Sequence, residues 1–166
     1  MTTVSATLTR YLDSKTPGYD LIEHGYTTSA VASAYASHLP LREVAKAVVL
    51  HDQDHYVMAV IPAMNRLVVS EVEQLLGRRL VLAKESELAP LFRDCEPGAI
   101  PALGQPFGLE LVWDESLSGD RDIYIEAGDH RHLVHLNHDQ FMALMRNRRH
   151  GPISCAPEEV WDLNRL

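Results

Sequence analysis

The amino-acid sequence predicts an α+β domain with a largely antiparallel or mixed β-sheet and short flanking helices. β-Branched apolar runs at Ala47–Leu50 and Tyr56–Ile61 flank a polar turn, which is typical of a hairpin. Segments with helical periodicity separate the other strand-like runs, but strands and helices do not alternate regularly as they do in a βαβ fold. The 166 residues are 46% apolar and show no break in composition, so we expect one domain over residues 1–166.

The remaining elements follow from periodicity and from residues that begin or end helices and strands. Further strands are expected at Tyr19–Glu23, Leu80–Leu82, Leu109–Trp113, Ile123–Glu126 and His132–Leu136. Helices are expected at Ser5–Lys15, Thr27–Leu39, Ser70–Gly77, Ser86–Phe92 and about His138–Met145. The tail over 151–166 is compatible with a loosely packed arm or with a final helical turn.

The charge and hydropathy patterns limit the kinds of partner and compartment. A net charge of −8 argues against non-specific adhesion to nucleic acid, which normally needs an excess of Lys and Arg. No N-terminal signal pattern is visible, and no apolar run approaches the roughly 18 residues that span a bilayer. Cys95 and Cys155 form no CxxC pair. We therefore expect a soluble cytoplasmic protein.

An acidic enzyme can still grip the end of a nucleic acid through a local basic patch. Two clusters could form such a patch: Arg78 with Arg79, and Arg146 with Arg148, Arg149 and His150. The alternative interpretation is that both clusters are solvated helix ends.

Lys46 stands at the entrance to the apolar strand before Val48, in a chain with only two other lysines, Lys15 and Lys84. A partly desolvated ammonium beside a buried strand interacts more strongly with a phosphate or carboxyl group than one on an open surface. The alternative is a lysine at a strand edge whose ammonium reaches water.

The segment Cys95–Gly104 has neither helical nor strand periodicity, and glycines bound it. Such a loop can direct backbone N–H groups at a ligand oxygen, and these donors stabilise the oxyanion that forms when an ester is attacked. The alternative is an ordinary connection between two strands.

Four histidines near the C-terminal strands suggest a zinc site, since neutral imidazole is a common zinc ligand. These are His130, His132, His135 and His138. Alternation along a strand would put His135 on the opposite face from His130 and His132, and no HExxH motif occurs. Surface histidines, or a single functional histidine, account better for this spacing.

No GxSxG elbow, Walker loop or GxGxxG motif occurs, which removes the usual serine-hydrolase and nucleotide-binding interpretations. Three features remain: Lys46, the loop led by Gly98, and the turn Gly128-Asp129-His130. Their order and separation resemble the YbaK/EbsC family, which includes the editing domain inserted in bacterial prolyl-tRNA synthetase. The resemblance covers about Tyr19–Met145 and includes the ordered motifs around Lys46, Pro97–Gly104 and Ile125–His130.

The resemblance implies a mixed, barrel-like sheet with flanking helices. It also implies hydrolysis of the ester between an amino acid and the terminal adenosine of a tRNA, without metal or other cofactor. The substrate would be the 3′ end of an aminoacyl-tRNA, with prolyl-tRNA synthetase as a possible partner and neither membrane nor DNA involved. A small amino acid, with alanine on proline tRNA first, is the expected target.

The resemblance also assigns roles to residues. Lys46 matches the nearly invariant family lysine that holds the RNA end, and His130 would position water or substrate. Gly98, Ala99, Ile100, Pro101 and Ala102 would form the loop that cradles the aminoacyl group, together with Gly128. A substrate ribose hydroxyl and a positioned water would replace a catalytic triad.

One position departs from the family pattern. The family loop has proline four positions after its glycine, whereas this chain has Ala102 there and Pro101 one position earlier. We therefore expect a less narrow amino-acid pocket. A non-catalytic module that binds an aminoacyl group or RNA end, and a metal-dependent hydrolase using the histidines, are the alternative functions.

Overall fold

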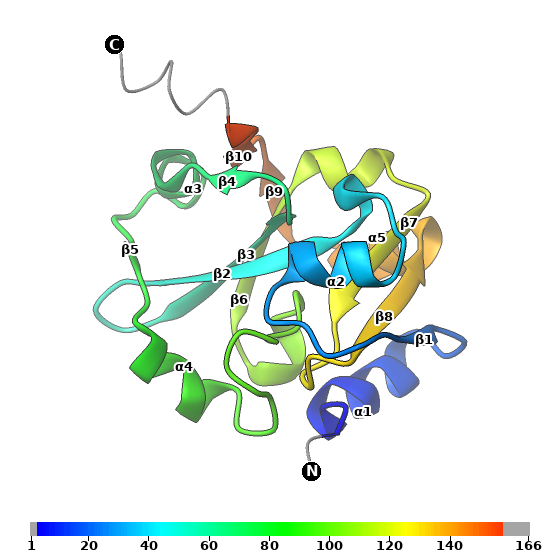
Figure 1. Ribbon diagram of the computed structural model, residues 1–166. Helices are drawn as coiled ribbons and strands as arrows, with labels where there is room; N and C mark the ends of the chain where they lie inside the picture. The colour runs from blue at the N-terminus through cyan, green and yellow to red at the C-terminus, as the bar shows by residue number, and fades with distance from the viewer. Residues whose placement is uncertain (1–2, 158–166) are drawn as a thin grey trace.

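The computed structural model describes residues 3–157, and Figure 1 shows how its elements are arranged. The α-helices and 3-10 turns are α1 (Ala6–Lys15), α2 (Ala30–Ala36), η1 (Leu41–Glu43), α3 (Val69–Leu76), α4 (Glu85–Leu91), η2 (Gln105–Phe107), η3 (Glu115–Gly119) and α5 (His138–Met145). The strands are β1 (Asp20–Glu23), β2 (Ala45–His51), β3 (Tyr56–Pro62), β4 (Arg66–Leu67), β5 (Val81–Leu82), β6 (Glu110–Asp114), β7 (Asp122–Glu126), β8 (His132–Asn137), β9 (Arg149–Gly151) and β10 (Ser154–Cys155). The fold is α+β, as the sequence predicts.

The sheets are mixed and centre on the predicted hairpin. β2 and β3 pair antiparallel, with Ala45 opposite Pro62 and His51 opposite Tyr56. β3 then pairs in parallel with β6, and β6 in parallel with β9, in a five-stranded sheet of order β5-β2-β3-β6-β9. A second, antiparallel sheet has the order β1-β8-β7, and β10 pairs with β4.

The barrel-like sheet implied by the family resemblance needs correction, because the strands of residues 3–157 do not close into a barrel. A barrel needs continuous hydrogen bonding around its wall. Here the outer strands of the five-stranded sheet, β5 and β9, have only two and three residues. An isolated parallel bridge between Val44 and Tyr124 connects the two larger sheets.

The first part of the C-terminal tail forms a strand. Ser154 of β10 lies opposite Leu67 of β4, so this segment is neither a loose arm nor a helical turn. The rest of the tail prediction concerns residues 158–166, which lie outside the described residues.

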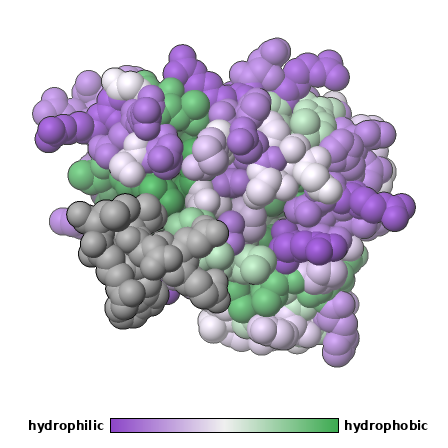
Figure 2. All heavy atoms as spheres, turned by 90° about the horizontal axis from the view of Figure 1, so that it is seen from above, coloured by the Kyte–Doolittle hydropathy of each residue, from purple (hydrophilic) through white to green (hydrophobic). Residues whose placement is uncertain are grey.

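The surface of the molecule is mostly hydrophilic on the face seen from above (Figure 2). Figure 2 shows that hydrophilic side chains separate the apolar patches on the face seen from above. Within residues 3–157, no helix is long and apolar enough to cross a membrane.

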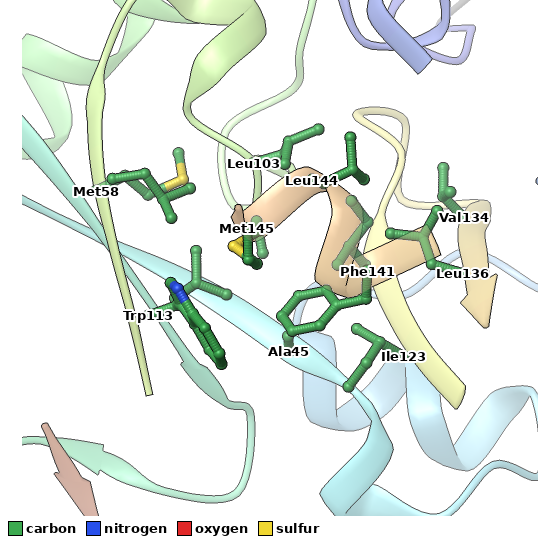
Figure 3. Packing of buried hydrophobic residues seen from close by; sticks show 14 of the residues in the cluster. Ala45, Met58, Leu103, Trp113, Ile123, Val134, Leu136, Phe141, Leu144 and Met145 are labelled. Carbon is green, nitrogen blue, oxygen red and sulfur yellow. The ribbon is translucent and has the colours of Figure 1, made fainter. Parts of the chain in front are cut away.

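The main hydrophobic core lies between the two larger sheets and is closed by α5. Figure 3 shows Phe141 of α5 pointing between Trp113 of β6 and Ile123 of β7. The rings of Trp113 and Phe141 meet edge to face, with their centroids 5.8 Å apart. Aromatic pairs favour this geometry, so the apolar face of α5 fixes the helix against both sheets.

The β2–β3 hairpin has a second apolar cluster on its other face. Ala45 and Val49 of β2 pack in the main core, whereas Leu50 packs with Val72 of α3 in this second cluster. Both faces are therefore buried, which explains the continuous apolar run in the sequence. Alternation places Lys46 on the same face of β2 as Leu50.

Helix α2 is shorter than the predicted Thr27–Leu39. It begins after Ser29, whose Oγ accepts a hydrogen bond from the N–H of Ala32 at 3.1 Å. It ends at Ala36, and His38 adopts a φ of 56°, which interrupts helical geometry. The residues before Ser29 are left non-helical beside the turn between β7 and β8.

Candidate active site

The turn between β7 and β8 holds His130 in an uncommon backbone conformation. Asp129 organises this turn, because its Oδ1 accepts hydrogen bonds from the N–H groups of Arg131 and His132, at 2.9 and 3.0 Å. His130 has a φ of 63° and is only 4% exposed. A strained, buried histidine of this kind indicates a functional position.

The imidazole of His130 connects this turn to the predicted loop. Its Nε2 lies 2.7 Å from the carbonyl oxygen of Pro97. Because a carbonyl oxygen only accepts, Nε2 donates, and in the neutral imidazole Nδ1 then carries the lone pair. Nδ1 is buried and has no hydrogen-bond partner within residues 3–157. In the neutral form, His130 therefore presents one unsatisfied acceptor to the site.

Gly98 occupies a position where a larger residue would be strained and crowded. Its φ is 82°, and a Cβ there would lie 3.3 Å from Cε1 of His130 and 3.5 Å from the carbonyl oxygen of Thr28. A hydrogen bond of 2.8 Å from the N–H of Glu96 to the carbonyl oxygen of Gly128 ties the loop to the turn. The positive φ therefore favours glycine, and a side chain here would push the His130 ring by a few tenths of an ångström.

The backbone of this loop offers hydrogen-bond donors. The N–H groups of Gly98 and Ile100 form no hydrogen bond with other described residues, and Gly98 lies at the surface. Such donors beside a histidine can bind a carbonyl oxygen or a developing oxyanion. The free N–H groups are compatible with the role predicted for this glycine-bounded segment, which stays a prediction.

The other predicted loop residues lie deeper. Ala99, Pro101 and Ala102 are buried, and Ala102 packs in the main core, whereas Ile100 is half-buried. The methyl groups of the two alanines therefore point into the protein. Gly128 has a φ of 101°, and a Cβ there would lie 3.1 Å from Cβ of Ser5, so its first role is close packing.

Glu126 is a member of this cluster that sequence reasoning missed. Its side chain is 3% exposed, and its Oε1 accepts a hydrogen bond of 2.7 Å from Oγ of Ser33 on α2. Oγ of Ser33 lies 2.6 Å from Oγ1 of Thr27. The backbone N–H of Thr27 in turn donates to the carbonyl oxygen of His130 at 3.1 Å. Glu126 thus anchors the start of α2 to the His130 turn.

Burial changes the acidity of Glu126. Desolvation raises the pKa of its carboxyl group to about 7, although the Ser33 hydroxyl and the nearby His130 favour the charged form. Its Oε2 is buried without a hydrogen-bond partner in residues 3–157. The available sequence signal was a glutamate at the end of an otherwise apolar strand, directly after Ile123–Ile125.

Lys46 lies on the same side of the sheets as Glu126. The parallel bridge places Val44 and Tyr124 side by side on the same face. Lys46 lies two positions after Val44 and Glu126 two positions after Tyr124, and a step of two positions along a strand keeps the same face. Lys46 is half-buried and forms no ion pair with a described residue. Desolvation, and to a lesser extent the charge of Arg66, lowers the pKa of its ammonium group.

Cys95 borders the loop but is a poor nucleophile. Burial, together with the neighbouring charge of Asp94, raises the pKa of its thiol to about 12. The thiol therefore stays protonated near neutral pH, and only the thiolate is an effective nucleophile.

The four histidines that suggested a metal site have separate partners. His132 Nδ1 lies 2.6 Å from Asp129, His135 contacts Asp20 and Asp122, and His138 lies near the carbonyl oxygen of Asp120. Among residues 3–157, no group of three or more His, Cys, Asp or Glu side chains is arranged to hold a metal ion. The histidine spacing thus leaves His130 alone at the loop.

One of the two arginines of the first predicted basic cluster is neutralised. Arg78 forms ion pairs with Asp52 and Glu110 on neighbouring segments. Arg79 has no ion pair with a described residue.

In the second cluster, Arg149 donates to the carbonyl oxygen of Leu75, and His150 pairs with Glu115. Both lie on β9 and not at a helix end. Arg146 follows the last residue of α5, as the alternative interpretation expected, and both it and Arg148 are exposed without an ion pair to a described residue. These two side chains keep an available positive charge.

Comparison with protein families identifies the class to which this fold and site belong. Residues 23–144 match the aminoacyl-tRNA editing domain, so the chain belongs to this family, also known as the YbaK family. This confirms the resemblance seen in the sequence. No curated protein matches the chain.

Solved structures show the same fold at low sequence identity. The hypothetical protein APE2540 matches with a TM-score of 0.79 and 18% identity over 90% of this chain and 99% of its own. A candidate trans-editing enzyme for prolyl-tRNA synthetase matches with a TM-score of 0.78 and 21% identity over 93% and 100%. A candidate signal transduction protein from Marinobacter aquaeolei VT8 matches with a TM-score of 0.76 and 16% identity, over 95% of this chain but only 32% of its own.

Proposed function

We propose that this protein is a trans-editing deacylase, which hydrolyses the ester between a mischarged amino acid and the 3′ end of a tRNA. The observation that carries the proposal is the exposed backbone at Gly98, held against the strained, buried His130. Lys46, which has no ion-pair partner among the described residues, lies on β2, on the same side of the sheets as Glu126. Membership of the editing family supplies the class of reaction.

The proposed reaction is the attack of water on the ester carbonyl carbon. The bond to the ribose oxygen then breaks, this oxygen takes up a proton, and the amino acid leaves as a carboxylate. The N–H groups of Gly98 and Ile100 would stabilise the oxyanion, an interaction that contributes about 10²–10³-fold to rate in other hydrolases. His130 would position water or substrate, and Lys46 would hold the RNA end.

We propose a small amino acid as the target, with alanine on proline tRNA first. The similarity to the candidate trans-editing enzyme for prolyl-tRNA synthetase supports this choice, and the synthetase itself is the proposed partner. The cytoplasm, where tRNAs are charged, is the proposed location. Steric exclusion discriminates by only about 1–3 kcal/mol per methylene, so we expect activity on seryl esters as well.

A panel of mischarged tRNAs tests the proposal. The protein is incubated with alanyl-, seryl-, cysteinyl- and prolyl-tRNA, and the released amino acid is measured. Preference for the alanyl ester supports the editing role, and preference for the prolyl ester contradicts it. Binding without release of any amino acid would favour a non-catalytic module in place of the enzyme.

The variant Lys46→Ala tests whether deacylation depends on Lys46. We expect it to abolish deacylation while the protein stays folded, because Lys46 lies at the start of β2 and is only half-buried. Circular dichroism checks the fold, and Lys15→Ala on α1 is the control for loss of one lysine. Normal turnover by a folded Lys46→Ala variant would remove Lys46 from the site.

A further inference from the structure

An exposed aromatic ring lies directly beside the site. Tyr26, in the segment between β1 and α2, is 54% exposed. Its ring centroid is 5.2 Å from that of His130, at an interplanar angle of 55°. The hydrogen bond from the N–H of Thr27 to the carbonyl oxygen of His130 holds the next residue against the turn. The ring therefore has a defined place at the rim of the site and an accessible surface.

A positive charge accompanies this ring. The guanidinium of Arg131 lies 5.5 Å from the ring centroid of Tyr26, within the range of a cation–π contact. Arg131 is exposed and forms no ion pair with any residue of 3–157. Asp129 fixes its backbone through the hydrogen bond to the Arg131 N–H. In a chain of net charge −8, an unpaired arginine at this site is a distinctive feature.

The two side chains together match the chemistry of a nucleotide. Proteins that bind single-stranded RNA stack bases on aromatic rings and contact the backbone phosphates with arginine. The ester that the proposed reaction cleaves is attached to the ribose of the terminal nucleoside, so the base and the phosphate of this nucleotide must lie next to the ester site. Tyr26 and Arg131 are the exposed aromatic and cationic groups that adjoin His130.

We infer that Tyr26 is the stacking surface for the terminal adenine of the tRNA and that Arg131 binds the phosphate on the 5′ side of this nucleoside. The inference rests on the proposed deacylase function and specifies how that site recognises its RNA end. Tyr26 and Arg131 bind substrate here and take no part in the bond-breaking step.

Substitution of Tyr26 tests the stacking contact with a minimal substrate. Loss of one base–aromatic stack corresponds to about a ten- to hundredfold change. We expect Tyr26→Ala to lower kcat/KM for alanyl-adenosine by this factor, and Tyr26→Phe to retain most of it. Tyr35→Ala is the matched control, because Tyr35 is a 67% exposed tyrosine on α2.

A second substrate separates stacking from a general effect on the site. The alanyl ester of ribose lacks the base, so Tyr26→Ala should hydrolyse it as the unsubstituted protein does. An equal loss on alanyl-adenosine and on alanyl-ribose, or no loss on either, overturns the stacking role of Tyr26. Retained activity in Tyr26→Phe excludes a dependence on the phenol hydroxyl.

Direct binding of adenosine 5′-monophosphate tests the inference independently of hydrolysis. We expect Tyr26→Ala and Arg131→Gln each to weaken this binding, whereas only Tyr26→Ala weakens binding of adenosine, which has no phosphate. Equal affinity in all variants overturns the inference. If the protein binds the nucleotide through Tyr26 but hydrolyses none of the esters, the recognition surface stands and the deacylase proposal fails.

Discussion

At the scale of single residues, the burial of Glu126 makes the stability of the fold depend on pH. Its pKa is raised from 4.5 to about 7 by desolvation, so the folded state binds its proton more tightly than the unfolded chain. The stability that this proton provides is present below pH 4.5 and is lost as the pH rises toward 7. A shift of this size corresponds to about 3 kcal/mol, as an order of magnitude.

Glu126→Gln should therefore flatten the pH dependence of the free energy of unfolding. The glutamine amide cannot ionise, while its oxygen still accepts the hydrogen bond from Ser33. We expect the variant and the parent protein to be similar at pH 4, and the variant to be more stable by about 3 kcal/mol at pH 8. Urea denaturation at both pH values measures this difference.

Glu23→Gln gives the same chemical change at an exposed position on β1 and serves as the control. It should leave the pH profile unchanged. A Glu126→Gln variant that loses stability between pH 4 and pH 8 as steeply as the parent protein would contradict the assignment of this dependence to Glu126.

Gly98 offers a prediction that separates strain from contact. Gly98→Ala places a Cβ 3.3 Å from Cε1 of His130, whereas Gly18→Ala, at a φ of 93°, meets nothing within 4 Å. In both variants an alanine must adopt a positive φ, and each variant should lose about 1–2 kcal/mol of stability. Only Gly98→Ala should also lose deacylation, because only its methyl group displaces the histidine.

The stability of both variants is measured by denaturation, and their activity is measured on alanyl-adenosine. Equal activity in the two variants would show that close approach of Gly98 to His130 is not needed for catalysis. A loss of activity in Gly18→Ala would instead connect activity to general stability.

Some residues of the candidate site could be proposed from the sequence, and others could not, for a physical reason. Gly98 and His130 belong to local motifs, a glycine-led loop and a turn, which can be read over a few positions. Ser33 and Glu126 meet only because α2 packs against the outer side of β7, and their hydrogen bond joins residues 93 positions apart. No local pattern encodes such a contact.

At the scale of elements, strands and helices with strong periodicity were predictable. The β2–β3 hairpin follows from two apolar runs around a polar turn, and the antiparallel pairing of the two strands confirms it. The two-residue strands β4 and β10 were not predicted, because their pairing depends on tertiary contact and not on their own sequence. The lengths of the edge strands β5 and β9 were also not predictable. These strands are only two and three residues long, and the five-stranded sheet does not close into a barrel.

Helix α2 carries a prediction at this scale. Its predicted start at Thr27 was wrong because Ser29 caps the helix and leaves Tyr26 and Thr27 free to contact the His130 turn. Ser29→Ala should cost about 1 kcal/mol and loosen this end of the helix. We expect KM for alanyl-adenosine to rise, since the segment before the cap contacts the turn.

Ser5→Ala is an informative comparison, because Ser5 caps α1 and accepts from the N–H of Leu8. It should lose at least as much stability, because Ser5 is buried and its Oγ also donates a hydrogen bond to Oδ1 of Asp94. A KM that stays unchanged in Ser29→Ala, despite the loss of stability, would show that α2 does not position the recognition segment.

At the scale of the whole molecule, the negative net charge makes the few unpaired arginines decisive for RNA binding. The ion pairs of Arg78 neutralise one of the candidates. Arg79 has no ion pair with a described residue, and Arg149 keeps its charge while it donates to the carbonyl oxygen of Leu75. Arg146 and Arg148, exposed after α5, retain charge for contacts beyond the terminal nucleotide. Affinity for tRNA should therefore fall with salt at a shallow logarithmic slope, with about 0.7 per phosphate contact for a single strand.

The double variant Arg146→Gln/Arg148→Gln should weaken tRNA binding and reduce this slope by about 1.4 if each arginine makes one contact. Hydrolysis of alanyl-adenosine should be unchanged, because this substrate does not extend beyond the site. Arg10→Gln/Arg42→Gln changes the net charge equally at other exposed positions and serves as the control. A similar loss of tRNA affinity in both double variants would indicate a general effect of charge, and a loss on both substrates would indicate damage to the fold.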